Sequence, residues 1–105
     1  MKVTLMLLLF FSTTALATYR TYDPYKDRKY INDAITGKCS SEHQRYDDLD
    51  FELKSSLSDM SNAEADKTFA DLKVATRNRW ECIEKELNKK NITLDLEKLY
   101  KENDL

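Results

Sequence analysis

Apolar residues recur at intervals of three and four positions along two long segments of the chain, and this is the spacing of one helical face. Charged and polar residues fill most of the positions between them. The first stripe consists of Tyr46, Leu49, Leu53, Leu57 and Met60, and the second of Ala65, Phe69, Leu72, Thr76, Trp80, Ile83 and Leu87. The pattern predicts two long amphipathic helices, over about residues 41–58 and 62–88.

A capping pattern precedes each of these two helices. Ser41 is followed by Gln44, and Ser61 by Glu64, which is the spacing of a capping box. A polar break at residues 58–62 separates the two stripes. We therefore expect the chain to reverse at this break, so that the two helices form an antiparallel hairpin.

Two shorter helices are predicted on either side of the hairpin. Asp23-Pro24 is typical of an N-cap followed by proline at the first helical position, and Gly37 stands where a left-handed residue would end the helix. These residues predict a helix over about residues 24–36. Thr93 is placed to cap a last helix over about residues 94–101.

The predicted fold is therefore all-α, a small bundle of three to four helices around the hairpin. The chain has one glycine and one proline among its 105 residues. A glycine-rich phosphate loop is excluded, and a β-sandwich or barrel lacks the turn residues that it needs.

The first 17 residues have the features of a secretory signal peptide. Lys2 is followed by an apolar run at residues 3–11, and Ala15-Leu16-Ala17 has the small-x-small form of a cleavage site. The apolar run is too short to span a bilayer. We expect residues 18–105 to form a single secreted domain, with residues 18–23 as a flexible lead-in.

Two cysteines, Cys39 and Cys82, suit the oxidising compartment that a signal peptide implies. They lie at equal distances from the break between the long helices, so folding back at that break would bring them together at the open end of the hairpin. Such a disulfide would be worth roughly 4 kcal/mol in the chain-entropy model. The alternative is that each cysteine joins a second chain.

Charge and composition exclude several further classes. The net charge of −2 gives no electrostatic drive toward nucleic acid. His43 is the only histidine and no Cys-x-x-Cys spacing occurs, so we expect neither a metal site nor a cofactor. His43 stands beside Glu42 in a polar helix start, where a solvated side chain is expected, and no residue near it in sequence is a partnered nucleophile. We expect no catalytic residues and no enzymatic activity.

Asn91-Ile92-Thr93 is an N-glycosylation sequon in a predicted loop between helices. Modification of Asn91 is expected in a eukaryotic secretory pathway. The alternative is an unmodified loop.

The N-terminal part of the expected mature chain alternates tyrosines with basic residues, a composition favoured at protein interfaces. The residues expected to contact a partner are Tyr19, Arg20, Tyr22, Tyr25, Lys26 and Arg28. In the alternative interpretation, Tyr30 and one other tyrosine pack on the hairpin and the rest belong to a flexible terminus.

Phe51 and Val74 lie off the main stripes of their helices. We expect them to form a second apolar face that receives the first and last helices. Alternatively, they line a cleft for an apolar ligand. A carrier of that kind requires a continuous interior cavity, lined by Phe51, Leu53, Phe69, Leu72 and Val74.

These features together predict a small, secreted, monomeric, non-enzymatic protein that binds an extracellular partner protein. Its plan is similar to that of many small proteins of saliva, venom and other secreted fluids. The alternative function is that of a carrier for a small apolar ligand held between the helices.

Overall fold

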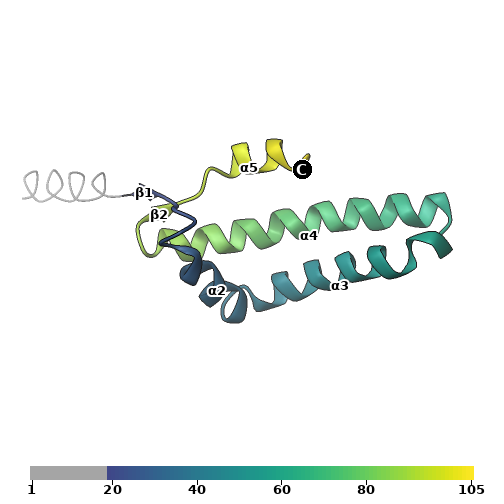
Figure 1. Cartoon of the computed structure of the whole chain (residues 1–105), viewed down its shortest axis with the longest axis horizontal. Helices are drawn as coiled ribbons and strands as arrows, with labels where there is room; N and C mark the ends of the chain where they lie inside the picture. Colours follow the sequence, from purple (N-terminus) through teal and green to yellow (C-terminus); the bar gives the residue numbers. More distant parts are fainter. Residues whose placement is uncertain (1–18) are drawn as a thin grey trace, which may run out of the picture.

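The computed structural model describes residues 19–105 and is dominated by helices. The elements, in chain order, are β1 (Arg20–Thr21), α2 (Arg28–Thr36), α3 (Ser40–Ser56), the 3₁₀ turn η1 (Leu57–Asp59), α4 (Asn62–Asn88), β2 (Ile92–Thr93) and α5 (Leu96–Glu102). This arrangement confirms the all-α prediction (Figure 1). The expected signal peptide, residues 1–17, lies outside the described residues.

The two long helices α3 and α4 lie side by side, connected through η1 (Figure 1). Cys39, which precedes α3, is bonded to Cys82 near the far end of α4, and His43 one turn further along α3 contacts Arg79. From the first contact to the second, the residue number rises from 39 to 43 on the α3 side and falls from 82 to 79 in α4. Leu49 and Leu53 of α3 and Ala75 of α4 are buried.

The disulfide between Cys39 and Cys82 is intramolecular, with a sequence separation of 43 residues. This confirms the expected pairing and excludes the alternative in which each cysteine joins a second chain. Cys39 is fully buried and belongs to the main hydrophobic cluster.

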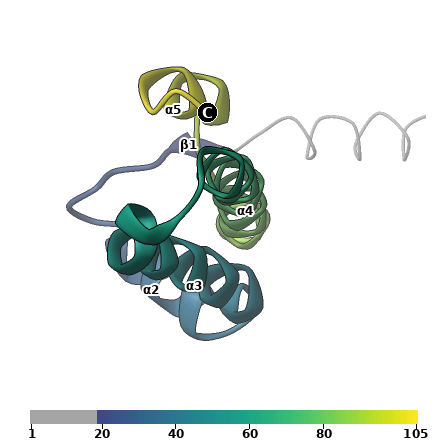
Figure 2. The same ribbon diagram turned by 90° about the vertical axis from the view of Figure 1, so that its right-hand side faces the viewer.

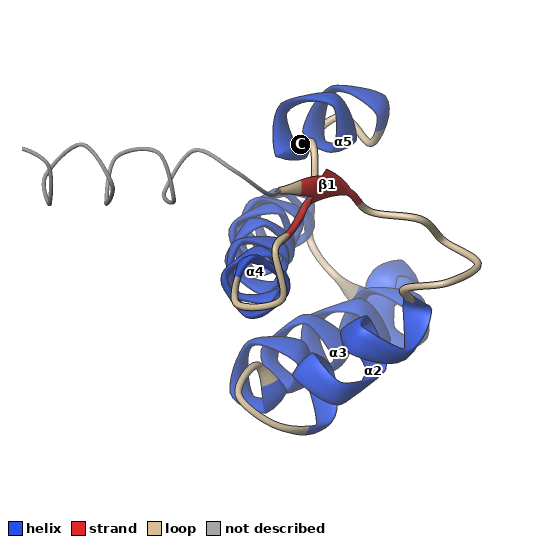
Figure 3. Cartoon of the chain, turned by 90° about the vertical axis from the view of Figure 1, so that its left-hand side faces the viewer, coloured by secondary structure: helices blue, strands red, loops and turns tan. Residues whose placement is uncertain are grey.

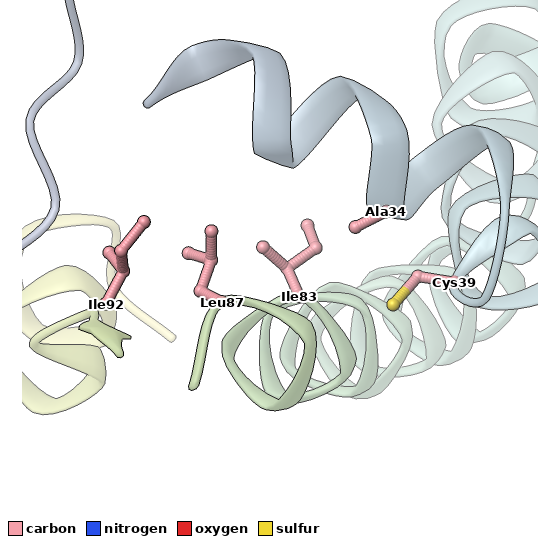
Figure 4. Close-up of a cluster of buried hydrophobic side chains, with 5 residues drawn as sticks. All are labelled: Ala34, Cys39, Ile83, Leu87 and Ile92. Atoms are coloured by element: carbon pink, nitrogen blue, oxygen red, sulfur yellow. The ribbon is translucent and has the colours of Figure 1, made fainter. Parts of the chain in front are cut away.

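That cluster lies at the disulfide end of the molecule, where α2 packs across α4 (Figure 4). Its buried members are Ala34, Cys39, Ile83, Leu87 and Ile92. Burying one isoleucine or leucine side chain contributes about 1.5–3 kcal/mol. The half-buried residues packed against the cluster include Tyr22, Ile31 and Trp80.

A short parallel strand pair, β1 with β2, was not expected from the sequence. The Arg20 N–H donates to the Asn91 carbonyl at 2.9 Å, and the Tyr22 N–H donates to the Thr93 carbonyl at 3.0 Å. Residues 20 and 21 are therefore held by backbone pairing, and the prediction of a flexible lead-in at residues 18–23 is wrong for this part of it. Burial of Ile92 fixes β2 against the core, and β1 pairs with the strand that is held there.

The first helix is shorter than predicted, because α2 begins at Arg28 and not at Pro24. The Asp23 carboxylate accepts a hydrogen bond from the Tyr25 N–H at 2.9 Å, and the Asp23 carbonyl accepts one from the Asp27 N–H at 2.8 Å. This local bonding forms a turn in place of a helix start. At the other end, Gly37 has φ −117°, so the expected left-handed cap is also wrong.

The two predicted capping boxes have different outcomes. Ser61 caps α4 by accepting the Glu64 N–H at 3.2 Å, as expected, and α4 has the predicted bounds. In α3 the N-cap is Cys39, so the cap expected at Ser41 is wrong, and the Gln44 side chain instead donates to Asp48. The disulfide and a bond from the Cys39 N–H to the Ala34 carbonyl fix the chain two residues earlier.

The last helix, α5, lies on the opposite side of α4 from α3 (Figures 1 and 2). Asp95 caps it by accepting the Lys98 N–H at 3.1 Å, and the predicted cap, Thr93, lies in β2. The Tyr100 hydroxyl donates to the Arg77 carbonyl of α4 at 3.3 Å. Among residues 19–105, none of the helices is both long enough and apolar enough to cross a membrane.

The expected second apolar face is wrong. Phe51 is 71 % exposed and Val74 is 59 % exposed, so neither α2 nor α5 covers them. The first helix packs at the disulfide end of α4. The residues after α5 reach the level of Leu72 and Thr76 but lie on another face of α4 than Val74.

Candidate functional site

The segment between β1 and α2, Tyr22–Asp27, is here named the N-terminal loop. It leads from the end of β1 away from α4 and ends at the start of α2 (Figure 3). An ion pair joins its two ends. The Arg20 guanidinium donates two parallel hydrogen bonds to the Asp27 carboxylate, at 2.7 and 2.6 Å. Bidentate pairs of this kind fix the geometry of both partners.

Asp27 is almost completely buried, with 1 % of its surface exposed. Its carboxylate also accepts the Asp23 N–H at 2.9 Å. Hydrogen bonding to Arg20, with that backbone N–H adding to it, lowers the pKa of Asp27 to about 2. The same hydrogen bond raises the pKa of Arg20. The pair therefore stays ionised at neutral pH and ties β1 to the first turn of α2.

The six residues expected to contact a partner divide into two groups. Arg20 and Tyr22 act inside the molecule, through the ion pair and through packing against the hydrophobic cluster. Tyr25 is 96 % exposed, and Lys26, Arg28 and Tyr19 are exposed as well. Tyr25 and Lys26 of the N-terminal loop and Arg28 at the start of α2 are thus exposed and close in sequence.

The inner side of the N-terminal loop forms one wall of a groove of about 380 Å³. The apolar residues that line it are Tyr22, Pro24, Ile31, Trp80, Leu94 and Leu99. Its charged residues, Asp95, Lys98 and Glu102, all come from α5 or its cap. Burial raises the pKa of the Tyr22 hydroxyl, which is therefore neutral at physiological pH. The groove can enclose a small ligand with an apolar body.

His43 is not the solvated capping residue that the sequence indicates. It is half-buried, and its Nδ1 accepts a hydrogen bond from Arg79 Nε at 3.0 Å. The Arg79 guanidinium lies 5.0 Å from the centre of the Tyr46 ring and 4.9 Å from that of Trp80, and burial lowers its pKa. Arg79 thus connects α3 to α4, and His43 acts in packing.

Glu42 lies beside the disulfide, and together with Cys39 and Cys82 it offers three ligand atoms within 4.8 Å of one another. Both sulfurs are consumed by the disulfide, so no thiolate is available to a metal ion. One Glu42 oxygen is buried without a hydrogen-bond partner among the described residues.

Asn91 occupies a tight turn directly after α4. Its φ of 60° is in the left-handed region, which asparagine tolerates better than most residues. Its carbonyl accepts the Arg20 N–H, while the residue itself is exposed. The acceptor residue of the sequon is therefore on the surface beside β1, whereas Ile92 is buried.

Most of the groove could not have been located from the sequence. Trp80 belonged to the predicted core stripe, and Leu94 and Leu99 to a short terminal helix, so no local signal joined them to Tyr22. The cavity expected for a carrier is wrong in its residues, because Phe51, Phe69 and Val74 are all exposed. The groove forms on the other side of α4, between the N-terminal loop and α5.

Comparison with known proteins gives no match to a family model, to a curated protein or to a solved structure.

Proposed function

We propose that this chain is a secreted, non-enzymatic protein that binds an extracellular protein through the outer side of the N-terminal loop. Secretion rests on the signal-peptide pattern of residues 1–17 and is compatible with the disulfide. Tyr25 and Lys26 of this loop make the contact, together with Arg28 at the start of α2. The observation that carries the proposal is a 96 % exposed tyrosine on a loop whose two ends are joined by an ion pair with a buried carboxylate.

An anchored loop loses little conformational entropy when it binds, and this favours affinity. Tyrosine and arginine are enriched among the residues that dominate binding energy at interfaces. The N-terminal loop combines these two properties. Lys26 and Arg28 suit a partner with an acidic surface, and Tyr25 suits an apolar recess in that surface.

The first turn of α2 adds an independent argument. Arg28 and Lys29 open this helix, and the turn contains no acidic residue. Cations at a helix N-terminus oppose the helix dipole, at a cost of about 0.3–1 kcal/mol each. Lys29 lies 5.1 Å from the centre of the Tyr30 ring and so has a contact inside the chain, whereas a contact outside the chain would explain Arg28.

The test compares capture of proteins from the fluid into which the chain is secreted. The double variant Tyr25→Ala/Arg28→Glu removes one exposed aromatic and reverses one charge. Its matched control is Phe51→Ala/Lys73→Glu, which makes the same changes at exposed positions of α3 and α4. Affinity is then measured with the purified partner.

We expect the loop variant to lose at least about 30-fold in affinity while the control binds like the wild type. Replacing Arg28 alone by Glu is expected to raise the free energy of unfolding by about 0.3–1 kcal/mol, which separates lost binding from lost folding. Equal binding by the two double variants would overturn the proposal. So would a capture experiment in which an excess of the free wild-type chain prevents the capture of none of the proteins.

Glycosylation of Asn91 is part of the same proposal. The exposure of Asn91, the acceptor residue, favours it. Expression in a eukaryotic secretory host is expected to give a mass that falls on enzymatic deglycosylation, and Asn91→Gln is expected to remove this shift. An unchanged mass on deglycosylation of the wild type would contradict it.

The groove favours a second candidate function, that of a carrier for a small ligand. Its volume of about 380 Å³ falls in the range of small-molecule sites. The ligand would lie between the N-terminal loop and α5, not between α3 and α4 as the sequence suggests. Saturable binding of a small apolar molecule that changes Trp80 fluorescence tests this candidate.

A further inference from the structure

The charges on the groove are unequal, and all of them lie on one wall. Among the residues of 19–105 that line the groove, Asp95 and Glu102 supply two carboxylates and Lys98 supplies the single cation. The Lys98 ammonium lies 4.0 Å from a Glu102 oxygen, so these two charges partly offset each other, and the Asp95 carboxylate keeps its charge while one of its oxygens caps α5. The α5 wall therefore carries a net negative charge toward the groove.

The facing wall is apolar. Tyr22, Ile31 and Trp80 form it, all half-buried against the hydrophobic cluster. Arg79 already lies 4.9 Å from the centre of the Trp80 ring. A second cation on this ring would be repelled by the first, so a charged ligand places its cationic group on the carboxylates and its apolar body on Trp80.

We infer that the groove binds a small organic cation, an ammonium group carried on a flat apolar body. This inference rests on the carrier function proposed above and names its ligand class. The ammonium group lies at the Asp95 carboxylate, because Lys98 stands between Asp95 and Glu102 and already pairs with Glu102. The apolar body lies between Trp80 and the inner side of the N-terminal loop. Anionic amphiphiles of the same shape are disfavoured by the same two carboxylates.

Trp80 is the only tryptophan in the chain, so its fluorescence reports occupancy of the groove directly. The probes are phenethylammonium, phenethyl alcohol and hydrocinnamate, which share a phenyl body and differ in charge. We expect saturable changes in Trp80 emission with all three. The ammonium is expected to bind about tenfold tighter than the carboxylate, with the alcohol between them, at low ionic strength.

A charge-neutral variant, Asp95→Asn/Glu102→Gln, tests the assignment of the carboxylates. Asparagine still caps a helix, so α5 is expected to remain intact. The matched control is Glu97→Gln/Asp104→Asn, which removes two charges from the same segment outside the groove. The first variant is expected to lose the preference for the cation, and the control to keep it.

The possible outcomes distinguish failure of the carrier function from failure of the inferred ligand class. If none of the probes changes Trp80 emission saturably, the carrier function itself fails. If all three bind equally, or the carboxylate binds best, the groove binds ligands but the inference about charge is wrong. A cation preference that persists in Asp95→Asn/Glu102→Gln also overturns the inference, because the charge would then act from elsewhere.

Discussion

Asp27 connects three parts of the N-terminal segment through one carboxylate. It binds the guanidinium of Arg20 in β1, accepts the backbone N–H of Asp23 in the N-terminal loop, and precedes α2. The sequence shows Arg20 and Asp27 only as two of many charged residues in a chain that is 34 % charged. Their pairing depends on the β1–β2 contact, which brings residue 20 to the start of α2, and no local pattern encodes that contact.

Replacing Asp27 by asparagine tests this role through its pH dependence. The pKa of Asp27 is lowered to about 2, so its ionisation stabilises the fold above its ordinary pKa of about 4 and this contribution is lost as the pH falls from about 4 to about 2. We expect Asp27→Asn to lower the urea midpoint at pH 7. The difference from the wild type should shrink below about pH 4. A difference as large at pH 2 as at pH 7 would show that the ion pair is not its source.

The elements differ in how far local sequence determines them. The start of α4 follows from the spacing of Ser61 and Glu64 alone, and both of its predicted bounds are correct. The start of α3 carries an equally good local signal at Ser41, yet Cys39 begins the helix because the disulfide fixes it there. β1 and β2 have two residues each, which is too short for any periodic signal. Elements fixed by long-range contacts are thus the ones that the sequence misplaces.

The two serines provide a matched pair of substitutions. Ser61→Ala removes the side chain that accepts the Glu64 N–H, and it is expected to lower the free energy of unfolding by about 1 kcal/mol. Ser41→Ala changes an exposed residue inside α3 that caps no helix, so little change is expected. Urea unfolding of both variants measures the difference. Equal losses would mean that Ser61 does not act as a cap.

At the scale of the whole molecule, burial is concentrated at the disulfide end. Five of the buried residues form one cluster there, and the N-terminal loop and the groove are both built against it. At the opposite end, Phe51, Leu57 and Phe69 are exposed. The sequence identifies the disulfide from the spacing of the cysteines. The groove was not predicted, because it is formed by three segments that meet only in the folded chain.

Removing the disulfide therefore affects the end of the molecule that carries both proposed sites. The double variant Cys39→Ser/Cys82→Ser is expected to lower the free energy of unfolding by roughly 4 kcal/mol, from the entropy of the 43-residue loop that the bond closes. Urea unfolding of the variant and the oxidised wild type measures it. A loss below about 1 kcal/mol would mean that packing alone holds α2 and α4 together.

The proposed protein contact and the groove both depend on the N-terminal loop being an ordered part of the fold. Backbone NMR order parameters for residues 20–27 test this claim most directly, with α4 as the internal reference. We expect values near those of rigid backbone, about 0.85, and a marked decrease in Asp27→Asn. Values below about 0.6 in the wild type would contradict the account, because the loop would then be flexible despite the ion pair.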